Sequence, residues 1–484
     1  MTGSGFNFDN TYIHLPKAFY TELSPVPVRK PEIVIFNAPL ATDMGLDFSG
    51  ISTDIKAALF SGNIMPEGSE PLAQAYAGHQ FGHFTMLGDG RAIVWGEHIT
   101  PSGQRLDIQF KGSGPTPYSR GADGRAVLGP MLREYIISEA MHALNIPTTR
   151  SLAVVTNGEK VYRETGLPGA ILTRIASSHI RVGTFEYAAL QQDKGIIQTL
   201  VNYTIDRHYP WIKEEQNKTL SLLKAVMEKQ ADLITHWMRV GFIHGVMNTD
   251  NMTLSGETID YGPCAFMDAY DPRTVFSSID HMERYAYANQ PAIAQWNLAR
   301  LAETMLPLLD DEMEKAADTT EEAVNSFGAL YKDKWLSMMR AKLGLFGARA
   351  EDESLITDLL DWMQRAGADY TNTFRHLTEE KPPQDKPYND RAFKEWYTRW
   401  QVQLAKNTKP LKSSLSLMRA NNPAVIPRNQ KVEQVLDAAT NGDLKPLKDL
   451  LTALQEPYNN RSNLKPYQSP PKKEERVYQT FCGT

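Results

Sequence analysis

A short segment, residues 244–262, carries the side chains best suited to chemistry. It opens with His244-Gly245, places Asn251 seven residues after the histidine, and closes with Ile259-Asp260-Tyr261-Gly262. The amide oxygen of Asn251 and the carboxylate of Asp260 are hard ligands that suit Mg²⁺ or Mn²⁺. Substrate phosphates and waters complete the coordination of such ions, so two protein ligands suffice. The spacing predicts a divalent-metal site for a nucleotide; the alternative is a chance set of polar residues at a helix–strand junction.

The same segment is similar to the catalytic segment of a protein kinase, where the Asn and the Asp of a D-x-G turn hold the metal ions. One part is missing, because Val246 stands two residues after His244, where a kinase has its catalytic Asp. Asp250 is the candidate replacement, since it adjoins Asn251 and can accept a proton from an attacking hydroxyl. Its alternative role is to cap a turn.

Lys111, at the end of a predicted strand, is the candidate for a phosphate-binding lysine. In kinases a Glu from a nearby helix holds this lysine over the phosphates. Glu134 fits that role, and Glu139 on the same predicted helix competes with it. The alternative is that these charges are merely solvated, which is the commoner fate of Lys and Glu.

A glycine-containing turn, Leu87-Gly88-Asp89-Gly90-Arg91, precedes another predicted strand. Glycines allow backbone N–H groups to approach phosphate oxygens closely, and Arg91 adds positive charge. Gly88, Gly90 and Arg91 are therefore candidate nucleotide contacts. A plain hairpin turn is the alternative.

A loop of 14 residues, Gly112–Arg125, is dense in small and turn-forming residues and contains Asp123 and Gly124. Loops of this length inside a domain are usually functional or disordered, and the composition favours function. Arg174 and Arg181 are further candidates, because guanidinium groups match phosphate geometry and stay charged in a desolvated pocket. Isolated arginines are more often surface residues.

Two other residue pairs have residue types found in metal or disulfide sites. His79 and His83 have the spacing of zinc ligands on a helix, but the glycines around them argue against a helix, so we expect no metal there. Cys264 and Cys482 are the two cysteines of the chain. That number excludes a disulfide framework and a cysteine-rich zinc site.

Periodic patterns predict the elements that position these groups. Alternation predicts strands, and Asn157-Gly158 between two alternating runs predicts a type I′ hairpin. Helical spacing of apolar residues predicts the helices, of which residues 219–240 lead directly to His244. The predicted strands are 91–97, 106–111, 152–156, 160–163 and 169–175, and the predicted helices are 53–60, 128–144, 219–240, 295–306 and 391–404.

The order of these elements predicts an α+β protein with the two-lobed organisation of a protein kinase. A β-rich N-lobe spans residues 76–183, and a helical C-lobe with the metal and catalytic segment spans 184–345. Residues 1–75 are expected to form an extended N-terminal arm. Residues 346–460 are expected to form a helical extension, and 461–484 a loose tail that contains Cys482.

The bulk composition is that of an ordinary globular protein, with 484 residues, 42% hydrophobic and 22% charged. The net charge of −6 argues against nucleic-acid binding. The N-terminal residues lack the features of a signal peptide, and no stretch reaches the roughly 20 apolar residues that a membrane helix needs. We therefore expect a cytoplasmic protein without a membrane partner, and a monomer.

Several segments, taken in order, resemble the selenoprotein O family, whose bacterial branch is also called YdiU. The matching stretches are Leu87–Ala92, Lys111–Arg120, Asp123–Val127 and Ile259–Pro263. The resemblance is close from about residue 76 to about residue 291 and reaches the C-terminal cysteine. Several long matches in one order are far more specific than any single motif.

The resemblance implies a kinase-like fold that binds ATP in a reversed orientation. It implies transfer of AMP to Ser, Thr or Tyr hydroxyls of other proteins, with release of pyrophosphate and with Mg²⁺ or Mn²⁺ as cofactor. UMP transfer from UTP with Mn²⁺ is associated with related bacterial proteins. The implied roles are an ion pair for Lys111 and Glu134, nucleotide contacts for Gly88, Gly90, Arg91, Lys111, Asp123, Gly124, Arg174, Arg181 and Asp260, the catalytic base for Asp250, and metal ligands for Asn251 and Asp260.

The chain departs from the family in two respects, in Cys482 and in the place of Cys264 directly after Tyr261-Gly262-Pro263, and it leaves two alternatives open. Cys482 fills the place of a selenocysteine found in eukaryotic members, and Cys264 is the residue that could form a regulatory disulfide with it. A catalytically dead pseudokinase scaffold is favoured by Val246 and disfavoured by the retained Lys111 and metal ligands. A conventional phosphotransferase is the other alternative.

Overall fold

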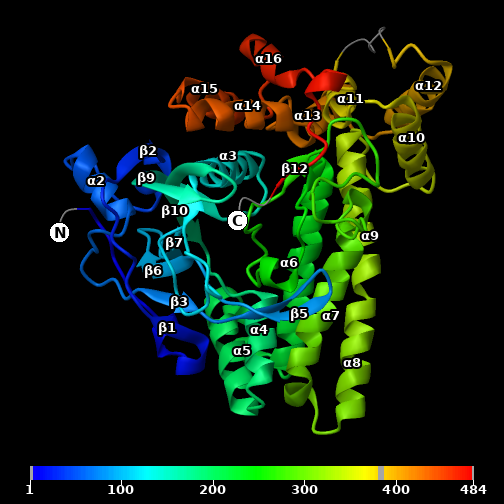
Figure 1. Cartoon of the computed structure of the whole chain (residues 1–484). Helices are drawn as coiled ribbons and strands as arrows, with labels where there is room; N and C mark the ends of the chain where they lie inside the picture. The colour runs from blue at the N-terminus through cyan, green and yellow to red at the C-terminus, as the bar shows by residue number, and fades with distance from the viewer. Residues whose placement is uncertain (1–3, 380–385, 482–484) are drawn as a thin grey trace.

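The computed structural model describes residues 4–379 and 386–481, and it combines an antiparallel β-sheet with a larger helical part (Figure 1). The eight-stranded sheet has the order β1-β3-β6-β7-β10-β9-β2, and β8 pairs with β10. β4 and β5 form a separate hairpin, and β11 pairs with β12. The strands are β1 Tyr20–Glu22, β2 Glu32–Phe36, β3 Leu72–Gln74, β4 Ala77–Gln80, β5 His83–Met86, β6 Ala92–Ile99, β7 Arg105–Lys111, β8 Ala126–Val127, β9 Arg150–Tyr162, β10 Gly166–Ala176, β11 Phe242–Ile243 and β12 Ala265–Phe266.

Most of the helices come after the strands of the main sheet in the sequence. Figure 1 shows the long helices α6 to α9 on one side of the molecule, the sheet on the other, and α10 to α16 across one end. The helices are α1 Ala38–Asp43, α2 Thr53–Phe60, α3 Leu128–Ala143, α4 Val182–Leu190, α5 Lys194–His208, α6 Lys218–Val240, α7 Gln290–Leu309, α8 Met313–Asn325, α9 Phe327–Lys342, α10 Asp352–Ala366, α11 Tyr370–His376, α12 Arg391–Ala405, α13 Leu411–Asn421, α14 Asn429–Thr440, α15 Lys445–Leu454 and α16 Lys465–Gln468. The predicted α+β class is therefore confirmed.

The central strands of the main sheet are packed against buried side chains on both faces. Trp95 and Phe110, on β6 and β7, pack with Phe60 of α2 on one face of the sheet. On the other face, Leu132 and Ile136 of α3 belong to the core that continues into the helical part. Because both faces are covered, β7 and α3 hold Lys111 and Glu134 in fixed positions.

Helix α6 delivers the chain to the segment that begins with His244. The Asn217 side chain caps its first turn by accepting a hydrogen bond from the Leu220 backbone N–H. Gly241 ends the helix in the left-handed conformation, with φ of +72°. β11 then leads directly to His244, whose ring is buried and bonds to the Ile259 carbonyl at 2.8 Å.

Three sequence-based predictions about the fold are wrong. Residues 1–75 are not an extended arm, because β1, β2 and β3 are strands of the main sheet. Asn157-Gly158 does not turn a hairpin: β9 continues through it, and the turn to β10 comes at residues 163–165. Gly158 instead takes its positive φ of +73° within β9, next to a register irregularity opposite Pro168 and Ala170.

The third correction concerns the predicted loose tail. Part of its described residues, 461–481, is anchored to the rest of the chain: Leu464 and Gln468 are buried, while residues 472–476 are exposed. Thr480 is buried and pairs with Ser277, and its hydroxyl donates to the Pro263 carbonyl at 2.6 Å. Cys482 lies outside the described residues, so its pairing with Cys264 stays a prediction. The domain boundaries at residues 183, 345 and 460 also stay predictions.

None of the helices in the described parts of the chain combines the length and the hydropathy that are needed to cross a bilayer.

Candidate active site

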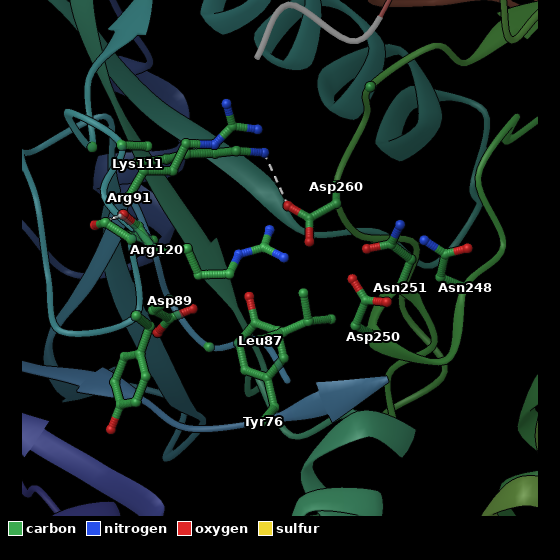
Figure 2. A pocket seen from close by; sticks show the side chains of 18 of the residues that line it. Tyr76, Leu87, Asp89, Arg91, Lys111, Arg120, Asn248, Asp250, Asn251 and Asp260 are labelled. Carbon is green, nitrogen blue, oxygen red and sulfur yellow. Dashed lines mark hydrogen bonds and ion pairs between the residues drawn. The ribbon is translucent and has the colours of Figure 1, made fainter. Parts of the chain in front are cut away.

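A cavity of about 630 Å³ opens between the sheet and the helical part. Its lining contains Lys111 from β7 together with Asp250, Asn251 and Asp260 from the segment after α6. Figure 2 shows Lys111 reaching across the cavity to Asp260, with Asn248, Asp250 and Asn251 on the same wall as Asp260. The predicted site residues that line the cavity are Gly88, Gly90, Arg91, Lys111, Asp123, Gly124, Arg174, Arg181, Asp250, Asn251 and Asp260.

Glu134 is buried behind Lys111 and joins it to the site. Lys111 Nζ donates to Glu134 Oε2 at 2.8 Å and to Asp260 Oδ1 at 2.9 Å. Arg174 bridges the same two carboxylates, from Nε to Glu134 at 2.8 Å and from Nη2 to Asp260 at 2.6 Å. Two cations and two carboxylates thus form one buried network. Glu139, the competing candidate, pairs with Arg150 at 2.7 Å instead.

Arg181 joins the Asp260 side of this network to the segment that carries Asp250. Its Nη1 donates to Asp260 Oδ2 at 3.3 Å and to the Asp250 backbone carbonyl at 3.0 Å. The guanidinium carbon lies 4.4 Å from the centroid of the Tyr76 ring, a cation–π contact. These contacts hold a buried positive charge at the cavity wall.

Asp260 remains ionised at the centre of this cluster. Burial opposes the charge, but Arg174, Lys111 and Arg181 outweigh it and hold the pKa of Asp260 well below its usual range. Asp260 has a φ of +59°, an uncommon conformation for a residue with a side chain, which turns its carboxylate toward the three cations. Asn251 Nδ2 donates to the Val246 carbonyl at 3.0 Å, which leaves the amide oxygen as the potential ligand.

Asp250 lies in a tight, buried part of the same wall. Burial raises its pKa to about 7, Arg181 acts in the opposite direction, and Asp260 adds to the rise. Its Oδ1 is buried and has no hydrogen-bond partner among the described residues. A Cβ at Gly78 would come within 2.9 Å of that oxygen, so glycine leaves room for the carboxylate. A carboxylate in these surroundings is suited to exchange a proton near neutral pH.

The glycines of the predicted phosphate turn have a different local role. A Cβ at Gly88 would lie 2.4 Å from the Tyr118 ring, and one at Gly90 would lie 2.9 Å from the Tyr118 carbonyl. Gly124 similarly packs against Gly114, where a Cβ would lie 2.1 Å from the carbonyl oxygen. The glycines therefore allow the loop of residues 112–125 to fold closely over residues 87–91 at the cavity edge.

Asp123 is exposed, and its ion-pair partner, Arg163, was not predicted from the sequence. Arg163 binds it with both guanidinium nitrogens, at 2.9 Å and 3.1 Å, and Arg163 also lines the cavity. The ion pair lowers the pKa of Asp123. Arg163 lies in the turn between β9 and β10, which the incorrectly predicted hairpin had placed elsewhere.

Several other cavity residues were not identified from the sequence. Asp89 is buried, and burial raises its pKa, while its carboxylate accepts the Gln74 backbone N–H at 3.0 Å. Asn248 accepts hydrogen bonds from Tyr285 at 2.6 Å and from the Phe81 backbone at 3.1 Å. Asn248 could have been predicted as a site residue, because it lies three residues before Asn251 in the sequence. Further lining residues that sequence reasoning missed are Tyr76, Gln80, Gln109, Tyr118 and Ile279.

His79 and His83 lie on the two strands of a hairpin and not on a helix. His79 on β4 binds Glu186 through its ring, and His83 on β5 lies opposite Gln80 of β4. Across the described ranges, 4–379 and 386–481, no cluster of three or more His, Cys, Asp or Glu side chains could hold a metal ion. An ion held by Asn251 and Asp260 would need further oxygen ligands to complete its coordination.

The chain is similar along its whole length to known protein-modifying enzymes. Residues 4–455 match the family model described as Protein adenylyltransferase SelO. The chain is 64% identical to the Protein nucleotidyltransferase YdiU of Nitrosococcus oceani, covering 99% of this chain and 98% of that protein. Identity is 58% to the protein of the same name from Alcanivorax borkumensis and 56% to that from Bacillus thuringiensis, in each case over 99% of both chains. The chain therefore belongs to the protein adenylyltransferase SelO family and is a nucleotidyltransferase enzyme.

Proposed function

We propose that this enzyme transfers AMP from ATP to Ser, Thr or Tyr hydroxyls of other proteins and releases pyrophosphate. The observation that carries the proposal is one cavity in which Lys111, Arg174 and Arg181 surround Asp260 while Asp250 stands beside them. Cations suit the phosphates of the nucleotide, and the second carboxylate suits the attacking hydroxyl. Attack at the α-phosphorus is supported by family membership, because spacing and charge are compatible with either phosphorus.

A kinase-like, two-lobed organisation with an inverted nucleotide forms part of the proposal. A β-sheet precedes a helical region, and the cavity lies between them. Lys111 on β7 pairs with Glu134 on α3, the strand-to-helix ion pair that kinases use. Val246 stands where a kinase has its catalytic acid, so Asp250, near Asp260, is the proposed base.

The oxygen donors fit a divalent metal ion. Asn251 offers its amide oxygen, Asp260 is held ionised, and the partnerless Oδ1 of Asp250 lies on the same wall. Hard oxygen ligands of this kind suit Mg²⁺ or Mn²⁺, and Asn251 and Asp260 are the residues that would hold it. When bound, the ion would neutralise phosphate charge.

The protein groups then have distinct roles in the proposed reaction. Asp250 accepts the proton of the target hydroxyl, whose oxygen forms a bond to the α-phosphorus. The bond from that phosphorus to the pyrophosphate oxygen breaks, and Lys111 and Arg174 stabilise the charge that grows on the leaving group. Arg181 holds the Asp250 backbone carbonyl and fixes the base relative to Asp260.

A direct test uses ATP labelled at either the α- or the γ-phosphorus. The purified enzyme is incubated with Mg²⁺ or Mn²⁺ and an unfolded, hydroxyl-rich protein such as casein. We expect label in protein from the α position alone, together with one pyrophosphate released for each AMP attached. Label from the γ position alone would establish a conventional kinase. Nucleotide binding without transfer or pyrophosphate release would favour a scaffold. A parallel series with α-labelled UTP and Mn²⁺ tests UMP transfer.

A further inference from the structure

A second cavity lies in the C-terminal part of the molecule, between α11 and the short elements η6 (Ser462–Leu464) and α16. It has a volume of about 480 Å³, and an adjoining cavity of similar volume shares Arg375, Glu379 and Asn460 with it. None of these residues lines the cavity that contains Asp260. The sequence patterns gave this region no chemical role.

Positive charge dominates the walls of this cavity. Arg375, Arg461 and Lys465 line it, against a single acidic residue, Glu379. Glu379 is itself paired with the His376 ring at 3.3 Å. The carboxylate nearest to Arg461 is that of Glu456, at 3.6 Å, beyond ordinary hydrogen-bond distance. The concentration of basic groups is notable in a chain of net charge −6.

The guanidinium groups are only partly satisfied. Arg375 Nε and both Nε and Nη2 of Arg461 are buried and have no hydrogen-bond partner among the described residues. Burial lowers the pKa of Arg375, Glu379 opposes this change, and the nearby Arg428 adds to it. These nitrogens are closed to solvent, so they mark incompletely paired guanidinium groups rather than the atoms that a ligand in the cavity would contact.

The far wall of the cavity is built rather than accidental. Asn372 of α11 donates to the Gln468 carbonyl at 3.1 Å, and Gln468 donates in turn to the Asn460 side chain at 3.0 Å. Arg428 also donates to the Gln468 carbonyl, at 3.1 Å. These bonds fix residues 460–468 against α11, so the basic groups are presented from a defined framework.

We propose that the cavity between α11 and α16 binds an anion that carries a phosphate group, through the guanidinium groups of Arg375 and Arg461 and the ammonium group of Lys465. Planar guanidinium groups donate paired hydrogen bonds to phosphate oxygens, and lysine adds a mobile point charge. The phosphate can belong to a free ion or to a phosphorylated side chain. The site is separate from the proposed nucleotide site and does not depend on the transfer reaction.

The test measures phosphate binding to the full-length enzyme by calorimetry and thermal unfolding, at constant ionic strength against chloride. Arg375→Gln and Arg461→Gln remove one positive charge each from the cavity. The matched control is Arg399→Gln, which removes an exposed arginine paired with Asp358 on the surface of α12. We expect phosphate to bind in this cavity of the wild-type enzyme, at least tenfold weaker binding in both cavity variants, and wild-type binding in the control.

Several results would overturn the proposal. Equal phosphate affinity in all variants would place the ion elsewhere, including the Asp260 cavity. A stabilisation that chloride reproduces would mean an adventitious ion only. Circular dichroism shows whether the variants fold. If they do not, the test is hydrogen exchange of the wild-type enzyme with and without phosphate. Phosphate should then slow the exchange of residues 460–468, and unchanged exchange refutes the site. Comparing the affinities of phosphoserine peptides and inorganic phosphate shows whether the bound phosphate group belongs to a protein side chain or to a free ion. The cavity variants are also assayed for transfer of α-label to protein. Normal transfer with weakened phosphate binding shows that the cavity is separate from the proposed transfer reaction.

Discussion

Replacing the two carboxylates of the active-site cavity one at a time separates their proposed roles. Asp250→Asn removes a proton acceptor but leaves the cation cluster around Asp260 intact. General bases contribute about 10²–10⁴-fold to a rate. We therefore expect turnover to fall by about that factor, with nucleotide affinity and thermal stability close to those of the unchanged enzyme.

Asp260→Asn should have a larger and broader effect. Asp260 accepts from Lys111 at 2.9 Å, from Arg174 at 2.6 Å and from Arg181 at 3.3 Å, so its neutralisation leaves three cations facing one another. Removal of one partner from a buried ion pair costs about 3–5 kcal/mol. That cost is a loss of folding stability, so the free energy of unfolding should fall by about that amount. Turnover falls for a separate reason, because a metal ion stabilises transition-state charge by several kcal/mol, at about 1.4 kcal/mol for each factor of ten, so the loss should exceed the about 10²–10⁴-fold expected for Asp250→Asn.

The assay follows α-labelled AMP in protein and pyrophosphate release, with nucleotide affinity measured by calorimetry and stability by urea unfolding. Asp358→Asn is the control, because its partly exposed carboxylate pairs with Arg399 and does not line the cavity of Asp260. Exposed ion pairs contribute about 0–1 kcal/mol, so the control should lose little. Equal losses for the Asp250 and Asp260 variants, or a larger loss for Asp250, would refute the assignment of roles.

Further predictions follow from single contacts. Gly78→Ala places a methyl group 2.9 Å from Asp250 Oδ1, so turnover should fall at unchanged nucleotide affinity, while Gly129→Ala, with no neighbour within 4 Å, should behave like the unchanged enzyme. Removal of divalent ions with a chelator should abolish transfer. Mn²⁺ or Mg²⁺ should restore transfer more fully than Ca²⁺, because Mn²⁺ and Mg²⁺ suit an octahedral site with short metal–oxygen distances. Burial lowers the pKa of His208 to about 3, below the ordinary value of 6.5. The unfolded chain therefore takes up a proton first as the pH falls, and His208 contributes stability that is complete above pH 6.5 and declines by about 1.4 kcal/mol per unit between 6.5 and 3. His208→Gln should flatten the pH dependence of urea unfolding between pH 7 and 5, and an unchanged slope would contradict this.

Local periodicity predicted the elements that carry the site. β7, α3 and α6 were expected within one or two residues of their observed bounds, because each has a sustained pattern of apolar residues. The pairing of Lys111 with Glu134 follows from a strand and a helix that are adjacent in sequence. What the sequence could not decide was the choice between Glu134 and Glu139, which depends on which face of α3 meets the sheet.

The errors arose where tertiary contacts override local signals. β1 and β3 are three residues long, too short to show a period, and they are strands only because the main sheet pairs with them. Asn157-Gly158 has the composition of a hairpin turn, but the strand continues through it and accommodates the positive φ of Gly158 as an irregularity. Because the turn lies at residues 163–165 and not at Asn157-Gly158, Arg163 was not predicted as a site residue. Its partner, Asp123, lies 40 residues away in the sequence.

A crystal structure with a non-hydrolysable ATP analogue and Mn²⁺ tests the central claim most directly. Anomalous scattering locates Mn²⁺ without ambiguity among the light atoms of the cavity. We predict an ion bound by the Asn251 amide oxygen and an Asp260 carboxylate oxygen, with the triphosphate against Lys111 and Arg174. A nucleotide bound without an ion at these two side chains, or bound outside the cavity of Asp260, would contradict the account.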